Sequence, residues 1–144
     1  MTKQSSTPYD TLLQKLLSRY IDMALNPESG IRKQDGRSVV NAVASSSAGN
    51  AIAWTWIQDN WAEIRTYFDT SVSSPIARMF ESVTGGFNTA TDLAELEAFA
   101  EANSDNLGTA QRATESAIVT TKANLKWMQN YFDDIVDWLS KKHM

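Results

Sequence analysis

Apolar side chains recur along this chain at steps of three and four residues, and no segment of any length alternates with a period of two. This spacing places the apolar residues on one face of an α-helix and argues against strands. In the clearest run, Ile52 and Trp56 lie off the main stripe, and a helix that is apolar on more than one side is expected to pack between two neighbours. That run covers residues 50–68, and its main stripe consists of Trp54, Ile57, Trp61, Ile64 and Phe68.

The same spacing predicts further helices between turns rich in Gly, Pro, Ser and Asn. They cover about 9–25, 31–46, 75–83 and 109–129, with one that starts at an Asn88 N-cap and a short last one from Phe132 to Leu139. The fold class is therefore all-α, with about six or seven helices. We expect an α-solenoid-like stack of antiparallel helix pairs, similar to HEAT or armadillo repeats, with a closed bundle as the other arrangement.

The chain has 144 residues and a mass of 16.0 kDa, which fits one domain. We expect a disordered leader over residues 1–8 and a single helical-repeat domain over 9–142. The net charge of −4 argues against sequence-independent binding to nucleic acid, which needs a basic face. No apolar stretch approaches the roughly 18 residues that a bilayer span requires.

The residue types that carry most enzyme chemistry are scarce. There is no cysteine, and His143 is the one histidine, so thiolate nucleophiles, cysteine zinc sites and multi-histidine metal sites are excluded. The acidic groups on two helices, Asp133 to Asp137 and Glu95 to Glu101, lie on charged faces and are interpreted as solvated rather than as an acid–base pair. The chain by itself is not expected to be an enzyme, and we expect no cofactor in it.

Four groups of residues occur in an order and at a spacing that resembles one known family. They are Leu25-Asn26-Pro27 with Ile31 to Asp35; Ala53-Trp54 with Gln58 to Trp61; Phe87-Asn88-Thr89 with Leu93, Leu96 and Phe99; and Arg112-Ala113 with Glu115, Thr121 to Trp127 and Trp138-Leu139. Together they resemble the end of the C-terminal helical domain of zinc aminopeptidases, of the aminopeptidase N and endoplasmic reticulum aminopeptidase types. The resemblance covers residues 9–139.

The resemblance implies that catalysis occurs elsewhere in a longer protein. In that family an HExxH motif and a later glutamate hold zinc in an earlier domain, and this chain has neither that motif nor the family's Gly-Ala-Met-Glu-Asn motif. The C-terminal domain is an α-solenoid bowl that closes the peptide chamber and in some members contributes to a homodimer. The implied partners are the preceding catalytic and helical parts of the enzyme and its peptide substrate. The implied location is membrane-anchored and extracellular, or lumenal, with a cytosolic location also known in the family.

Two functions follow from these observations. The first is a noncatalytic C-terminal segment of a zinc-dependent aminopeptidase, which walls the peptide chamber and stabilises the enzyme. The alternative is a free-standing helical-repeat module, derived from that family, that binds other proteins. A piece of a solenoid lacks its neighbour, so the first function predicts an exposed apolar face around Leu12, Leu16 and Tyr20 and self-association of the chain.

Five residues are candidates for the substrate chamber or an interface. The polar cluster of Arg32, Lys33, Gln34 and Asp35 offers a guanidinium that can hold a peptide carboxylate, although a solvated first helical turn is the simpler and favoured explanation. Trp56 is the fifth candidate, because it lies off the main stripe of its helix.

Seven residues are expected to have structural roles. Trp54 and Trp61 belong to the core, since each buries a large area. The helix over 109–129 carries small residues on one face, ending in Asn124, so we expect it to lie deep among other helices. The remaining structural residues are Arg112, paired with Glu115 or another acid, and Trp127 and Trp138.

Overall fold

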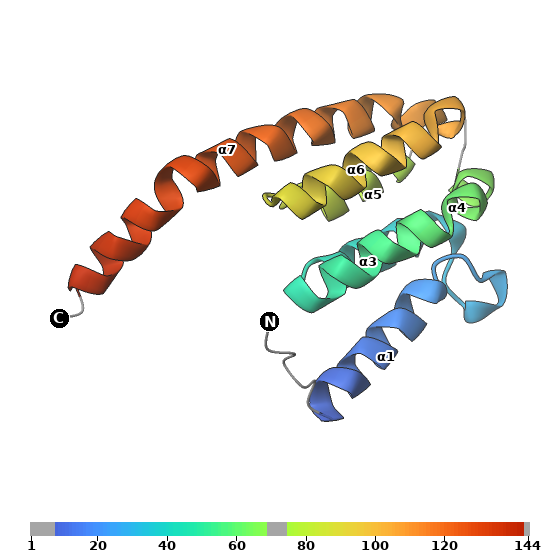
Figure 1. Ribbon diagram of the computed structural model, residues 1–144. Helices are drawn as coiled ribbons and strands as arrows, with labels where there is room; N and C mark the ends of the chain where they lie inside the picture. The colour runs from blue at the N-terminus through green and yellow to red at the C-terminus, as the bar shows by residue number, and fades with distance from the viewer. Residues whose placement is uncertain (1–7, 69–74, 143–144) are drawn as a thin grey trace. The chain divides into compact units, whose positions relative to one another are not determined.

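The computed structural model describes residues 8–68 and 75–142 (Figure 1). Within these ranges the chain forms seven α-helices and four short 3-10 helices and no strand, which confirms the all-α expectation. None of the described helices is both long and apolar enough to cross a membrane. The chain divides into two compact units, Met1–Val83 and Thr84–Met144. The stacking of helix pairs as a solenoid stays a prediction.

The first unit is built around three helices that contact one another. In it, α2 packs on α3, and α1 packs on both of them. Its α-helices are α1 (Pro8–Asp22), α2 (Gly36–Ala44), α3 (Ser47–Asp59), α4 (Trp61–Phe68) and α5 (Pro75–Thr84), and 3-10 helices occupy Pro27–Ser29 and Lys33–Asp35. The expected loop at residues 70–74 lies outside the described residues, as do most of the expected leader and His143.

The helix expected over residues 50–68 is in fact two helices, α3 and α4, because the chain turns at Asn60. There the backbone leaves the helical region, and the Asn60 side-chain amide donates a 2.9 Å hydrogen bond to the carbonyl oxygen of Trp56. The apolar stripe nevertheless keeps its phase through the break. All five of its members are buried, as expected: Trp54, Ile57, Trp61, Ile64 and Phe68.

The helix expected over 31–46 is shorter than its pattern indicated. The 3-10 turn Lys33–Asp35 precedes it, and α2 ends at Ala44. Ser46 then caps α3, with its Oγ accepting a 3.0 Å hydrogen bond from the Gly49 N–H. A Cβ at Gly49 would lie 1.9 Å from the carbonyl oxygen of Val43. The tight α2–α3 connection therefore depends on the absence of a side chain at this position.

Aromatic side chains from three helices form the core of the first unit. The ring of Phe80 in α5 lies edge-on to Trp54 and Trp61, with centroids 5.9 and 6.4 Å away. Asn50 in α3 donates a 2.9 Å hydrogen bond to the Val83 carbonyl oxygen near the end of α5. Edge-to-face pairs of this kind add about 1 kcal/mol each to the burial of their area.

The second unit consists of α6 (Ala90–Ala102), the 3-10 turns Ser104–Asn106 and Gly108–Ala110, and α7 (Gln111–Lys142). Thr89, not Asn88, is the N-cap of α6. Its hydroxyl accepts a hydrogen bond from the Asp92 N–H, and the Asp92 carboxylate accepts one from the Thr89 N–H, at 3.1 and 3.0 Å. This reciprocal capping box needs the acid three residues after the cap, which Thr89 has and Asn88 lacks.

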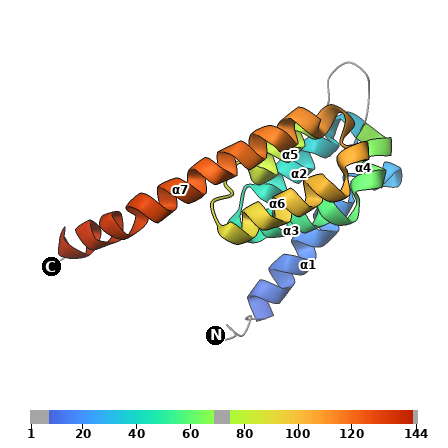
Figure 2. The same ribbon diagram turned by 45° about the horizontal axis from the view of Figure 1, so that its top comes forward.

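The last two expected helices are one continuous helix of 32 residues, α7. No Gly or Pro occurs within it, so nothing in its sequence forces a break. As Figure 2 shows, α6 lies beside the first half of α7, and the second half extends beyond it. The small residues of this stripe are buried, as expected: Ala110 in the turn before α7, and Ala113, Ala117 and Thr121 in its first half.

Candidate functional site

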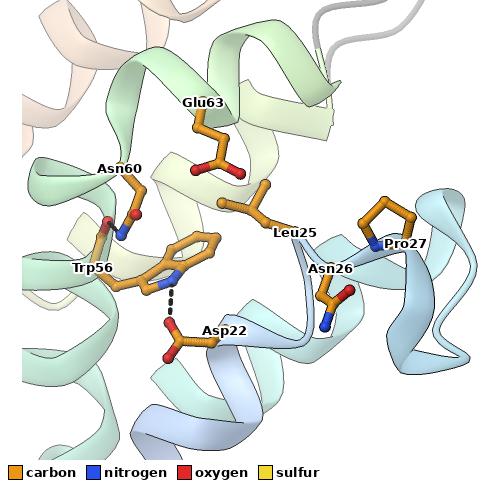
Figure 3. Close-up of a pocket in the computed structure, with 7 residues that line it drawn as sticks. All are labelled: Asp22, Leu25, Asn26, Pro27, Trp56, Asn60 and Glu63. Atoms are coloured by element: carbon orange, nitrogen blue, oxygen red, sulfur yellow. Dashed lines mark hydrogen bonds between the residues drawn. The ribbon is translucent and has the colours of Figure 1, made fainter.

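A polar pocket of about 340 Å³ lies in the first unit, where the end of α1 meets α3 and the start of α4. Trp56, one of the candidate residues from the sequence, forms part of its wall. Figure 3 shows the seven lining residues: Asp22, Leu25, Asn26, Pro27, Trp56, Asn60 and Glu63.

The indole of Trp56 is held in place by the end of α1. Its Nε1–H donates a 3.0 Å hydrogen bond to Oδ1 of Asp22, and the side chain is 6% exposed. A buried indole N–H needs such an acceptor, because an unmade hydrogen bond in the interior costs about 1–3 kcal/mol. Asp22 ends α1, so this bond joins α1 to α3 beside the pocket.

The charged groups that line the pocket are the carboxylates of Asp22 and Glu63. The carboxylate of Glu63 extends toward Leu25 and Trp56, and that of Asp22 faces the indole (Figure 3). Asn60 uses its amide nitrogen on the backbone of Trp56, which leaves its Oδ1 as a further acceptor. The seven lining residues include no Lys, Arg or His, so the pocket is acidic and its chemistry fits an ammonium or guanidinium group.

A second pocket of about 480 Å³ adjoins the first and shares Asp22, Trp56 and Asn60 with it. Its other lining residues come from α1 and α3 and include Gln14, Ser18 and Ile52. Trp56 and Asp22 therefore border both hollows. Among the described residues no group of three or more His, Cys, Asp or Glu side chains is placed to hold a metal ion.

The polar cluster from the sequence lies in the 3-10 turn before α2 and does not line these pockets. The Nε of Arg32 donates a 2.7 Å charged hydrogen bond to Oδ2 of Asp35 within the turn. The ammonium of Lys33 lies 5.1 Å from the ring centroid of Tyr67 in α4. Arg32, Lys33 and Gln34 are exposed and Asp35 is partly buried, so the guanidinium of Arg32 is already paired with one carboxylate inside its own turn.

The residues expected to be structural divide between buried and exposed positions. Asn124 is partly buried, and its amide donates a 2.9 Å hydrogen bond to the Phe87 carbonyl oxygen before α6. Arg112 and Glu115 are both exposed in the first turns of α7, and Glu115 accepts a hydrogen bond from Gln111. Trp127 and Trp138 are 49% and 57% exposed in the second half of α7.

The sequence analysis did not single out three of the pocket's polar residues, Asp22, Asn60 and Glu63. Asn60 belongs to one of the four groups of residues behind the family resemblance, which was the only signal available for it. Nothing in helical periodicity brings Asp22 to Trp56, since the two lie 34 residues apart along the chain.

Comparisons of the amino-acid sequence with known proteins point to one family. The family model of the ERAP1-like C-terminal domain matches residues 6–123. Aminopeptidase N of the dog is 37% identical over 124 residues, which is 85% of this chain and 12% of the relative. The bovine aminopeptidase N is 37% identical over 125 residues and the human one 31% over 127. The chain spans only 12–13% of the length of these relatives.

Proposed function

Since the chain belongs to the ERAP1-like C-terminal domain family of aminopeptidase N-type enzymes, we propose that it is the noncatalytic C-terminal segment of a zinc-dependent aminopeptidase. The enzyme would remove N-terminal amino acids from peptides, and this segment would wall the peptide chamber and stabilise the folded enzyme. The main support for the proposal is the sequence match to aminopeptidase N of the dog, which covers 85% of this chain but only 12% of that peptidase.

The exposed face of α1 supports attachment to a larger protein. Leu12, Leu16 and Tyr20 follow one another at intervals of four residues and are 56%, 55% and 44% exposed, as the sequence predicted. Soluble monomers rarely expose a contiguous apolar patch of more than a few hundred Å². We propose that preceding helices of the enzyme cover this face.

Zinc would be held by the catalytic domain, as the family resemblance implies. The described residues of this chain do not fit a zinc site, because they contain no suitable group of His, Cys, Asp and Glu side chains. The contribution of the chain to catalysis would be enclosure: a wall holds the substrate in place and excludes water from the chamber.

The acidic pocket and the polar turn are the candidate contacts to the peptide. The pocket of Asp22, Trp56 and Glu63 suits a cationic group of a peptide, and Arg32 in its turn suits an anionic one. Peptide substrate and a second copy of the protein are the further partners that we propose. We also propose the location that the resemblance implies, either anchored at the cell surface or lumenal.

The alternative function is a free-standing helical-repeat module that binds other proteins. Such a module is expected to cover its terminal repeat with polar residues. The exposed face of α1 is apolar and therefore does not form such a polar cap. This observation favours the function as a segment of an aminopeptidase over the free-standing module.

A complementation assay tests the proposal. A related aminopeptidase N truncated before this region is mixed with the chain, and hydrolysis of a leucyl anilide is followed. We expect the mixture to regain activity and the chain with zinc alone to have none. A folded, helical chain that restores nothing would favour the binding module, and activity of the chain alone would contradict both functions.

A matched pair of variants adds a test of the α1 face. Leu16→Glu places a charge on the apolar face, whereas Lys15→Glu places the same charge on the polar side of α1. We expect Leu16→Glu to abolish complementation and Lys15→Glu to preserve it. Full activity of Leu16→Glu, equal to that of Lys15→Glu, would show that the apolar face of α1 does not mediate attachment to the enzyme.

A further inference from the structure

The two adjoining pockets of the first unit share one wall, the buried indole of Trp56. The acidic pocket has a volume of about 340 Å³, and the hollow between α1 and α3 has about 480 Å³. Both volumes lie within the range of roughly 300–1,000 Å³ that is typical of pockets for small ligands. We call the two pockets together the α1–α3 groove.

The charge of the α1–α3 groove is negative. Three carboxylates line it, those of Asp22, Asp59 and Glu63, and its lining residues include no Lys, Arg or His. Within the described residues the carboxylate of Glu63 has no hydrogen bond or ion pair. Arg19, the basic residue closest to Asp22 in the sequence, lines a third hollow and neither of these two. The groove therefore favours a ligand that brings its own positive charge.

The acceptors of the acidic pocket belong to different elements. Asp22 ends α1, Asn60 follows α3, and Glu63 lies in the first turn of α4 (Figure 3). A guanidinium is planar and has five N–H donors, so it can bond to several such acceptors at once, whereas an ammonium is a compact and strongly hydrated charge. Leu25, Pro27 and the indole line the same pocket and can contact the aliphatic stem of an arginine. The pocket thus suits an arginine side chain.

The hollow between α1 and α3 differs from the acidic pocket, because aliphatic side chains contribute to its lining. These are Ile21, Ala48, Ala51 and Ile52. A free guanidinium compound would leave this hollow empty. In an extended peptide, by contrast, side chains two residues apart point the same way and are about 7 Å apart. A peptide can therefore place an arginine in the acidic pocket and an aliphatic side chain in the adjoining hollow.

We propose that the α1–α3 groove binds an arginine side chain of a peptide, with its guanidinium held by Asp22 and Glu63 and a nearby aliphatic side chain in the hollow between α1 and α3. The inference rests on the proposed function in one respect: the peptide is then the substrate of the parent enzyme, and its arginine lies beyond the N-terminal residue. Because both carboxylates are exposed, water and salt weaken the contact, and a dissociation constant of roughly 0.1–1 mM is expected.

NMR titration of the full chain tests the proposal. The probe is the blocked peptide acetyl-Leu-Ala-Arg-Ala-Leu-amide, and the reporter is the indole N–H of Trp56, which donates its hydrogen bond to Asp22. The matched control peptide has citrulline in place of arginine, since citrulline has nearly the same shape and no charge. We expect a saturable shift with the arginine peptide and an affinity at least about fivefold lower for the citrulline peptide. Equal affinities, or no saturable shift up to about 10 mM, would overturn the proposal.

A second probe distinguishes a peptide from a free guanidinium compound. Butylguanidinium has the charged group and the aliphatic stem of arginine, but no peptide backbone and no leucine. We expect it to bind at least about threefold more weakly than the arginine peptide, because the hollow between α1 and α3 stays empty. Equal affinity of butylguanidinium would overturn the assignment of a peptide as the ligand.

Three charge variants locate the binding site. Glu63→Gln removes an exposed carboxylate of the groove, and Asp22→Asn removes the other charge while it keeps an acceptor oxygen for the indole. Glu81→Gln removes the same charge from an exposed position of α5 that lines neither pocket. We expect each groove variant to bind the arginine peptide at least about threefold more weakly and Glu81→Gln to bind it as before.

An equal loss of affinity in Glu63→Gln and Glu81→Gln would indicate general attraction to an acidic chain and would overturn the proposal. Circular dichroism checks that each variant is folded. If Asp22→Asn loses helix, Glu63→Gln decides the test by itself, because no described residue depends on the Glu63 carboxylate for a hydrogen bond.

Peptide binding by the chain decides this inference separately from the complementation assay. Saturable binding of the arginine peptide by a chain that restores no aminopeptidase activity would support the groove and count against the proposed enzyme. Restored activity with a chain that does not bind the arginine peptide would overturn the groove and leave the proposed function standing.

Discussion

The indole N–H of Trp56 donates a 3.0 Å hydrogen bond to the carboxylate of Asp22, across 34 residues of chain. The bond joins the last residue of α1 to the C-terminal part of α3. It also borders the acidic pocket, so one contact both secures α1 and shapes the candidate site. The donor Trp56 and the acceptor Asp22 can each be replaced by mutation without changing the other.

Replacing Asp22 by Ala is expected to destabilise the chain by about 1–3 kcal/mol, because the buried indole N–H loses its acceptor. Urea unfolding followed by circular dichroism measures the change. Asp59→Ala, at an exposed position near the end of α3, is the control and is expected to change stability by less than about 0.5 kcal/mol. Equal effects of the two variants would show that the hydrogen bond does not secure α1.

Gly49→Ala is expected to lower stability by roughly 2 kcal/mol or more, since the new Cβ would lie 1.9 Å from the Val43 carbonyl oxygen and α3 would have to move. Gly86→Ala is the matched control, because a Cβ at Gly86 would meet nothing within 4 Å. Thermal unfolding of both variants measures the difference. A Gly49→Ala chain as stable as the Gly86→Ala chain would contradict the close α2–α3 approach.

Asn124→Ala is expected to cost about 1–2 kcal/mol, because α7 loses its 2.9 Å hydrogen bond to the carbonyl oxygen of Phe87. Asn130→Ala removes an exposed amide from the same helix and is expected to be nearly neutral. Hydrogen exchange of the amides around the start of α6 reports the local effect. Unchanged protection there in Asn124→Ala would argue against a role of this bond in fixing α6 to α7.

Arg32→Ala is expected to change the unfolding free energy by less than about 0.5 kcal/mol, because its pair with Asp35 is exposed and such pairs contribute little. In the complementation assay, the same variant is expected to raise KM for a longer peptide and not for the leucyl anilide, if Arg32 contacts the distal part of the substrate. Identical KM values for the long peptide in both chains would remove Arg32 from the chamber wall.

The helical character of the chain could be predicted from local pattern, and so could most of its buried residues. The stripe from Trp54 to Phe68 is buried as its spacing indicated, and so is the small-residue side of α7 up to Thr121. These features depend on the 3.6-residue period of the α-helix. The spacing of apolar residues along the chain shows this period directly. The exposed face at Leu12, Leu16 and Tyr20 was predicted in the same way.

Helix boundaries were less predictable, because they depend on individual hydrogen bonds. Asn60 divides α3 from α4 although the apolar stripe continues through it, and Thr89 replaces Asn88 as the cap because Asp92 completes the capping box. After Gln129 the reverse holds: one helix was expected to end there and another to follow from Phe132, yet α7 continues without a break.

The amino-acid sequence by itself determined the all-α class, the family and the main buried stripes, since each of these follows from residue type and spacing along the chain. Only the tertiary structure decided that Asp22 meets Trp56 beside an acidic pocket and that the side of α7 covered by α6 continues as an exposed apolar face. Both depend on which segments lie side by side and on how far each helix extends past its neighbour. Helical periodicity identifies the face that a residue occupies, but not what covers that face.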